Sequence, residues 1–180
     1  VRTFGVHSAM PTREALRRCP DAIVVHPRIG HYSAVSQQIF AVFHEFTPLV
    51  QGLSLDEAFL DVSAGTCALG DGEQVGREIK RLIRERTELT ASVGVAPNKL
   101  IAKMASEFKK PNGISIVQTD DLQALIWPLP CRKINGVGPK ADEKLQGHGI
   151  HTIGELAQRE RGWLIDTFGK SYGAWLHEVS

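Results

Sequence analysis

The chain has 180 residues, a formal net charge of +1, 42% hydrophobic residues and 23% charged residues. This composition is ordinary for a soluble globular protein, and no apolar run approaches the length of a membrane-spanning helix. The length is enough for one large domain or two small ones, and so small a net charge does not predict any particular class of partner.

The first third of the chain predicts two helices and three extended segments. Residues 11–19 predict a helix that starts at one proline and is ended by another. Residues 22–25, with the sequence Ala-Ile-Val-Val, predict a short buried strand. Apolar residues at helical spacing predict a second helix over residues 31–46, and extended runs follow over residues 49–54 and 57–62.

The middle of the chain continues this alternation. A glycine-rich loop over residues 64–72 leads to a helix marked by apolar residues between 75 and 83, and residues 91–95 predict a strand. A helix over residues 98–108 and a strand over residues 114–117 follow. This order predicts an α+β fold, with a mixed or antiparallel sheet that is backed by helices on one face.

The last third of the chain has a different pattern. Strand signals are absent after residue 119, and short helical patterns follow one another to the end. We therefore expect a domain boundary near residues 118–120 and a small all-helical domain beyond it.

Two adjacent acids, Asp56 and Glu57, stand at the beginning of the apolar run in Ser-Leu-Asp-Glu-Ala-Phe-Leu-Asp-Val. Successive side chains of a strand point to opposite faces, so both acids cannot point into the core. If the strand begins at this point, both lie at the rim of the sheet, where carboxylates suit Mg²⁺ together with phosphates and water. A pair of exposed acids beside a strand is the plainer interpretation. Asp61 belongs to the other end of the strand, and we leave it out of the metal site.

Basic residues are concentrated between residues 77 and 110, where nine basic and four acidic residues leave a surplus of five positive charges. For residues 77–86 we favour solvated helix faces. The turn Lys109-Lys110-Pro111-Asn112-Gly113 is different, because it presents lysines between a helix and a strand. Lysine serves as a point charge for phosphate.

A glycine-containing hairpin is predicted at Ile134-Asn135-Gly136-Val137-Gly138-Pro139-Lys140-Ala141. Two glycines allow a tight turn and a close approach to a ligand, and a helix that starts at the proline offers free N–H groups to an anion. The pattern is typical of a helix-hairpin-helix, which holds the sugar-phosphate backbone of DNA without reading bases.

These segments resemble one family. SLDEAFLDVS, ASVGVAPNKLIAKMASEFKKPNGI and INGVGPKADEKL, with the opening RTFGVHSAMP, look like a Y-family (translesion) DNA polymerase of the bacterial DNA polymerase IV, or DinB, type. The resemblance covers essentially the whole chain. It implies fingers over residues 1–28, palm over residues 29–117 and a thumb with the helix-hairpin-helix over residues 118–180.

The resemblance also implies a role for each matched residue in template-directed transfer of a deoxynucleotide from dNTP to a primer 3′-hydroxyl, opposite damaged bases as well as intact ones. Asp56 and Glu57 would be catalytic and would bind two Mg²⁺ ions. The nucleotide-binding residues would be Arg2, Lys110, Ser8 and Ala9, with the last two roofing the new base pair. The residues on the DNA backbone would be Gly136, Val137, Gly138 and Lys140.

The sequence differs from the family pattern by omission. No Asp-x-Asp-x-Phe-Phe segment, which carries the family's first catalytic aspartate, occurs in it, and the chain begins at Val1 without a methionine. We therefore expect a fragment that also lacks the little-finger domain and is inactive alone. The implied partners are primer-template DNA, dNTP and, through other regions, a sliding clamp. We expect a monomer that does not bind membranes.

Three cysteines, Cys19, Cys67 and Cys131, lie far apart. Their odd number argues against a disulfide framework and indicates the cytoplasm. Three other functions stay open: a DNA-binding relative without catalysis, a nucleotide cyclase with a palm-like fold, and a structural helix-hairpin-helix module. The combination of acids, Arg2 and Lys110 argues against the first, and the hairpin argues against the second. The third leaves the first 117 residues unexplained.

Overall fold

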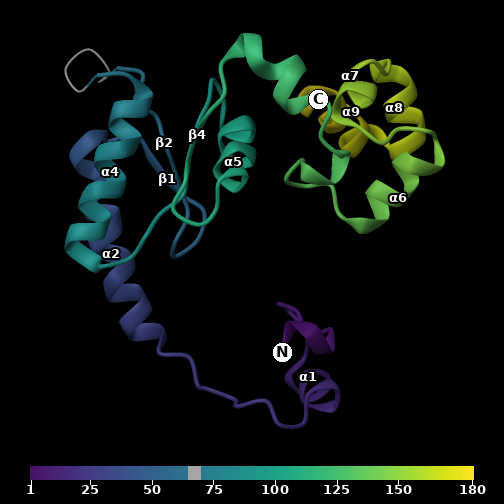
Figure 1. Ribbon diagram of the computed structural model, residues 1–180. Helices are drawn as coiled ribbons and strands as arrows, with labels where there is room; N and C mark the ends of the chain where they lie inside the picture. The colour runs from purple at the N-terminus through teal and green to yellow at the C-terminus, as the bar shows by residue number, and fades with distance from the viewer. Residues whose placement is uncertain (65–69) are drawn as a thin grey trace. The chain divides into compact units, whose positions relative to one another are not determined.

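A computed structural model describes residues 1–64 and 70–180 of the chain (Figure 1). Most of the predicted glycine-rich loop over residues 64–72, including Cys67, lies outside the described residues. The chain divides into two units, Val1–Ala34 and Val35–Ser180.

The first unit contains a short 3₁₀ turn and a helix. The turn η1 (Arg2–Phe4) ends at Gly5, whose φ of 72° lies in the left-handed region that favours glycine. The helix α1 (Thr12–Arg18) confirms the prediction for residues 11–19. Arg18 donates to the Gly5 carbonyl at 3.1 Å and to the Glu14 carboxylate at 2.8 Å, so one side chain ties the turn to the helix.

The prediction of a strand over residues 22–25 is wrong. These residues form no helix or strand, and Ile23, Val24 and Val25 are 91%, 59% and 79% exposed. An apolar run becomes a buried strand only when a neighbouring strand and a packed face receive it. In the part of the chain that the structure describes, no strand pairs with this run.

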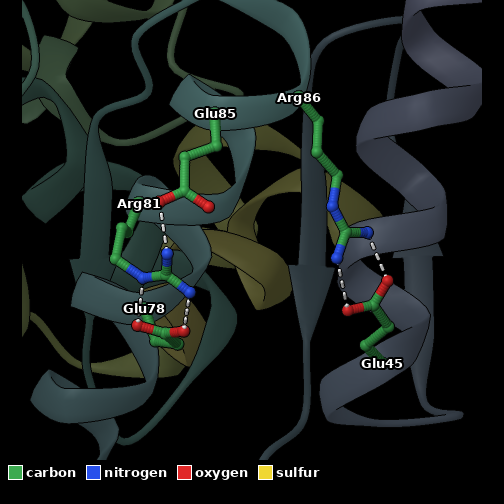
Figure 2. Close-up of polar contacts among 5 residues, drawn as sticks. All are labelled: Glu45, Glu78, Arg81, Glu85 and Arg86. Atoms are coloured by element: carbon green, nitrogen blue, oxygen red, sulfur yellow. Dashed lines mark hydrogen bonds and ion pairs between the residues drawn. The ribbon is translucent and has the colours of Figure 1, made fainter.

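Two helices cover one face of an antiparallel hairpin. The strands β1 (Val50–Gly52) and β2 (Ala58–Leu60) pair with Gly52 opposite Ala58. Apolar side chains of both strands pack with those of α2 (Ile29–Phe46) and α4 (Gly72–Thr87). The two helices lie side by side in Figure 1. Figure 2 shows the bidentate ion pair between Arg86 of α4 and Glu45 of α2, whose second contact is 3.0 Å long.

A parallel pair of strands, β3 (Val93–Val95) and β4 (Ile114–Ile116), has a helix on each face. A Cβ added at Gly76 of α4 would meet the side chains of Ile114 and Val93, so α4 covers that face. A Cβ at Gly94 would lie 2.0 Å from the Ala102 carbonyl oxygen, so α5 (Lys99–Phe108) covers the other face. The predicted α+β fold is confirmed. The described strands form two two-stranded sheets, one antiparallel and one parallel, and not the single sheet that we expected, and the helices do not all lie on one face. The small residue at position 94 lets the backbone of α5 approach the sheet closely.

Local signals in the sequence explain where these helices begin. Asp71 accepts a hydrogen bond from the Gln74 amide at 2.9 Å while the Gln74 side chain accepts from the Asp71 amide at 3.0 Å. This reciprocal capping box starts α4. Asn98 accepts from the Ile101 amide at 2.9 Å and is the N-cap of α5.

The rest of the chain is helical, as predicted, apart from one isolated bridge between Pro130 and Thr152. Its core contains wholly buried leucines and isoleucines from most of its helices, and residues of α5 join the same core. Within residues 1–64 and 70–180, no helix is long and apolar enough to span a bilayer. The helical elements are η2 (Thr119–Asp121), η3 (Leu122–Ile126), η4 (Cys131–Lys133), α6 (Pro139–Gly147), α7 (Ile153–Ala157), α8 (Arg161–Phe168) and α9 (Lys170–Val179).

Candidate active site

The acidic pair lies in the turn that joins β1 to β2. Asp56 is in the bend and exposed, and Glu57 directly precedes the first residue of β2. The amides of Leu53 and Ser54 donate to the Glu57 carbonyl at 2.8 and 3.3 Å, which closes the turn. Both acids therefore stand at the rim of a paired strand, where the strand fixes their backbone and their side chains reach outward.

Two serines hold this turn. The Ser36 hydroxyl of α2 donates to the Leu55 carbonyl at 2.5 Å and anchors the turn to the helix. The Ser54 hydroxyl donates to Asp56 Oδ1 at 2.7 Å and orients that carboxylate. A carboxylate oxygen has several lone pairs, so Asp56 keeps acceptor capacity for a further ligand.

Glu57 begins a chain of alternating charges. Its carboxylate forms an ion pair with Lys103 of α5, whose ammonium also lies 4.0 Å from Glu107. Glu107 in turn forms an ion pair with Lys110 at 2.5 Å. The side chain of Lys103 is 23% exposed and is the least exposed of the four side chains in this series of ion pairs. Residues that are far apart in the sequence are thereby linked from the acidic pair to the lysine turn.

The pKa of the Lys110 ammonium is affected by the same carboxylates. The hydrogen bond to Glu107 raises the pKa of the Lys110 ammonium above its usual value, and the charges of Glu57 and Asp56 act in the same direction. The structure thus brings Asp56, Glu57 and Lys110 into one electrostatic neighbourhood. Lys103 and Glu107 were not singled out as site residues from the sequence. The signal that could have found them is the charge alternation at positions 103, 107 and 110, which are four and three residues apart.

The donor set suits a divalent metal ion in type. Asp56 and Glu57 supply carboxylate oxygens, the ligands that Mg²⁺ prefers, and Mg²⁺ commonly uses one or two carboxylates with waters and substrate phosphates. Within residues 1–64 and 70–180, no group of three or more His, Cys, Asp and Glu side chains could hold a metal. The pair fits a metal that takes its other ligands from phosphate and water.

Asp61 lies at the opposite end of β2 from the acidic pair. Its amide donates to the Leu49 carbonyl at 3.0 Å, and its carboxylate accepts from the Ser63 amide at 3.0 Å. Hydrogen bonds with the backbone and the side chain of Ser63 lower the pKa of the Asp61 carboxyl, and the charge of Lys99 makes a smaller contribution in the same direction. Its exclusion from the metal site stays a prediction.

The predicted nucleotide-binding residues Arg2, Ser8 and Ala9 belong to the first unit. Arg2 donates to the Ser8 hydroxyl at 3.4 Å, so these two residues are brought together. Ala9 has a φ of 64°, in the left-handed region that few residues other than glycine adopt. That Arg2 faces the acidic pair stays a prediction.

The predicted DNA hairpin forms a tight turn before α6. Gly136 has a φ of 111°, and a Cβ there would lie 2.6 Å from the ring of Trp175. Val137 is buried and its amide donates to the Ile134 carbonyl at 3.0 Å. Gly138 precedes α6 with a φ of −82°, and an added Cβ would meet no atom within 4 Å. The fold therefore explains the glycine at 136 but not the glycine at 138.

The helix α9 supports the hairpin from behind. The Tyr172 hydroxyl donates to the Gly136 carbonyl at 3.0 Å, and the Tyr172 ring stacks on Trp175 at 5.1 Å between centroids. Both aromatic residues therefore hold the turn. Lys140 is exposed in the first turn of α6, beside the open position at Gly138.

Two family profiles match this chain in order. The profile of the impB/mucB/samB family matches residues 1–107. The chain belongs to the impB/mucB/samB family. The profile of the IMS family HHH motif matches residues 119–150, which contain the Gly136–Gly138 turn and α6. The predicted helix-hairpin-helix is thus confirmed as a family motif.

Curated relatives of this family member are DNA polymerases. The chain is 42% identical to DNA polymerase IV from Ralstonia nicotianae over 99% of its own length and 50% of that protein. It is 43% identical to DNA polymerase IV from Pseudomonas paraeruginosa over 99% of the chain and 51% of that protein. The chain spans about half the length of the curated relatives it matches.

Solved structures agree with this assignment. The crystal structure of DinB from Sulfolobus solfataricus has a TM-score of 0.87 and 30% identity, over 99% of this chain and 52% of that one. An insertion ternary complex of Dbh DNA polymerase has a TM-score of 0.86 and 30% identity, with the same coverage. The resemblance to Y-family polymerases of the DinB type is confirmed.

Proposed function

We propose that this chain is part of a template-directed DNA polymerase of the translesion type, which transfers a nucleotide from dNTP to a primer 3′-hydroxyl. The observation that carries the proposal is the link from Glu57 through Lys103 and Glu107 to Lys110, which joins one carboxylate of the acidic pair to a lysine suited to phosphate. Family membership supports it, because curated relatives along the whole chain are named DNA polymerase IV.

In this proposal Asp56 and Glu57 hold the divalent metal, which we take to be Mg²⁺. When bound, two such ions supply charge stabilisation for the attacking and leaving oxygens of an in-line displacement. Lys110 binds the triphosphate and offsets negative charge as the pyrophosphate departs. Arg2 is a further residue that binds the triphosphate. Small side chains at Ser8 and Ala9 leave room for a damaged template base.

The turn before α6 is the part of the chain that binds DNA in this proposal. The open position at Gly138 lets a backbone phosphate approach the first turn of α6, where the amides of Lys140 and Ala141 have no helical acceptor. Lys140 adds a positive charge at the same turn. Such contacts position DNA without reading its sequence.

We further propose that residues 1–28 are fingers, residues 29–117 palm and residues 118–180 thumb. The two family profiles, which divide between residues 107 and 119, support the second boundary. The protein acts in the cytoplasm as a monomer, with contacts to a sliding clamp through other regions. The 180-residue chain alone extends primers poorly, because its sequence contains no Asp-x-Asp-x-Phe-Phe segment to supply a third carboxylate.

The deciding experiment compares Asp56→Ala with Asp61→Ala in the complete protein. We expect Asp56→Ala to abolish Mg²⁺-dependent primer extension while primer-template affinity, measured by fluorescence anisotropy, stays within about twofold. Asp61→Ala removes the same charge from the other end of β2 and should keep extension. Equal loss of DNA binding and extension in Asp56→Ala would show that this acid is structural. Formation of a cyclic nucleotide instead of an extended primer would favour a cyclase.

A further inference from the structure

A basic cavity lies against α4. It has a volume of about 440 Å³ and is lined by Arg77, Lys80, Arg81, Arg84, Thr90 and Asn112. Residues three and four apart share one face of a helix, so the four cations form one stripe. The sequence alone favours a solvated helix face for this stripe. The structure adds that Thr90 and Asn112 line the same cavity, which is open to solvent.

Two of the four cations are already neutralised. Figure 2 shows Arg81 held between Glu78 and Glu85, with its Nε donating to Glu78 at 2.8 Å. Arg77 donates to Glu73 at 2.9 Å through its Nε. Both arginines therefore form walls of the cavity and contribute little net charge to it.

The other two cations have no carboxylate partner among residues 1–64 and 70–180. Lys80 donates only to neutral oxygens, the Ala91 carbonyl at 2.5 Å and the carbonyl and side chain of Asn112 at 2.8 and 2.7 Å. Arg84 donates one N–H to the Glu88 carbonyl. Its remaining N–H groups are available to a ligand.

The surroundings of Lys80 disfavour the positive charge of its ammonium group. Burial lowers the pKa of the Lys80 ammonium, and the positive charge of Arg77 lowers it further. Among residues 1–64 and 70–180 no carboxylate opposes these effects, so an anion in the cavity would relieve them.

We propose that this cavity binds a phosphate group. The guanidinium of Arg84 presents N–H donors in the fork geometry that matches phosphate oxygens. The Thr90 hydroxyl and the Asn112 side-chain amide add neutral donors at the wall, and Lys80 supplies a second positive charge. The phosphate can belong to a small phosphorylated molecule or to a nucleic-acid backbone.

This site is distinct from the proposed active site. The cavity lies on α4, which covers the Val93 face of the β3–β4 pair, whereas Lys103 and Glu107 lie on α5, which covers the Gly94 face. The proposal therefore does not rest on the polymerase function, and either can fail without the other.

The test is an NMR titration of the 180-residue chain with inorganic tripolyphosphate, with the amide signals of Thr90 and Asn112 as local probes. We expect saturable shifts at both amides. Arg84→Met should weaken the binding measured there at least about tenfold, because it removes a charge and several donors. Arg84→Gln, which keeps an amide donor but loses the charge, should weaken it by a similar factor.

The matched control is Arg86→Met. Arg86 lies on the same helix but is neutralised by Glu45 and does not line the cavity (Figure 2). It should retain binding within about twofold. Absent shifts at Thr90 and Asn112, or an equal loss in Arg86→Met, would overturn the proposal. So would citrate binding as tightly as tripolyphosphate, since the site would then not select phosphate.

A second arm identifies the source of the phosphate. A single-stranded oligothymidylate is titrated under the same conditions, and the same two amides are followed. Shifts at these amides that Arg84→Met removes indicate a nucleic-acid backbone as the ligand. Tripolyphosphate binding without oligothymidylate binding indicates a small phosphorylated molecule. Both results uphold the phosphate site.

Discussion

The ammonium of Lys103 pairs with the carboxylate of Glu57 although the two residues are 46 positions apart in the sequence. Lys103 sits in the middle of α5 and Glu57 at the start of β2, so the contact joins a helix to the rim of the hairpin. The lysine neutralises one of the two acids that we propose as metal ligands. It therefore competes with a metal for that carboxylate, and its removal has a measurable consequence.

We expect Lys103→Met to strengthen Mn²⁺ binding to the chain about fivefold at low ionic strength. Loss of the positive charge removes a repulsion worth about 1 kcal/mol in a partly solvated site. Electron paramagnetic resonance of free Mn²⁺ measures the affinity. Lys109→Met is the control, because Lys109 is exposed and should change affinity less than twofold. An unchanged affinity in Lys103→Met would mean that Glu57 does not bind the metal.

The two hairpin glycines should respond differently to the same substitution. Gly136→Ala forces a side chain into the left-handed region and against Trp175, so we expect it to cost roughly 1–3 kcal/mol of the free energy of unfolding. Gly138→Ala meets open space at an ordinary φ and should cost about 0.5 kcal/mol or less.

Urea denaturation gives both stabilities, and fluorescence anisotropy with a primer-template gives the affinity of the complete protein. Gly138→Ala should weaken DNA binding severalfold at nearly unchanged stability, since the new methyl group occupies the approach to α6. Unchanged affinity in Gly138→Ala would remove the hairpin from the DNA interface.

Two isoleucines test the corrected assignment of residues 22–25. Ile23 is 91% exposed, so Ile23→Ala should change the free energy of unfolding of this chain by less than about 0.5 kcal/mol. Ile83 is 2% exposed in the core between α2 and α4, so Ile83→Ala should cost about 2–5 kcal/mol. Thermal or urea unfolding of both variants measures these changes in the free energy of unfolding. A large loss in Ile23→Ala would show that this segment is buried in solution.

Cys131 predicts a dependence of stability on alkaline pH. Burial raises the pKa of its thiol to about 11, and the charges of Asp142 and Glu155 act in the same direction. Since the unfolded thiol has a pKa of about 8.5, the stabilising contribution is complete below that pH. It is lost as pH rises toward 11, by at most about 1.4 kcal/mol per pH unit.

The measurement is the free energy of unfolding of the native chain and of Cys131→Ala at pH 7, 9 and 10. The variant loses packing at every pH, but the difference between the two proteins should shrink from pH 9 upward. Titrations of other groups are common to both proteins and cancel. A difference that stays constant from pH 7 to 10 would contradict the assignment.

Local signals determined much of this protein from the sequence. Helical spacing predicted α2 and α4, and the capping residues Asp71 and Asn98 mark where two helices begin. The position of Asp56 and Glu57 before an apolar run placed both acids at a strand rim, as the structure has them. These features depend on interactions within a few residues, which a sequence pattern reports directly.

The tertiary structure decided what the pattern could not. Residues 22–25 are exposed in the structure, because an apolar run is buried only where another segment covers it. The tertiary structure placed α5 on the second face of β3 and β4 and thereby brought Lys103 to Glu57. It also set Lys80 beside Asn112, 32 residues away, and so formed a basic cavity. Contacts of this kind depend on strand register and helix placement, and the sequence near each residue does not encode them.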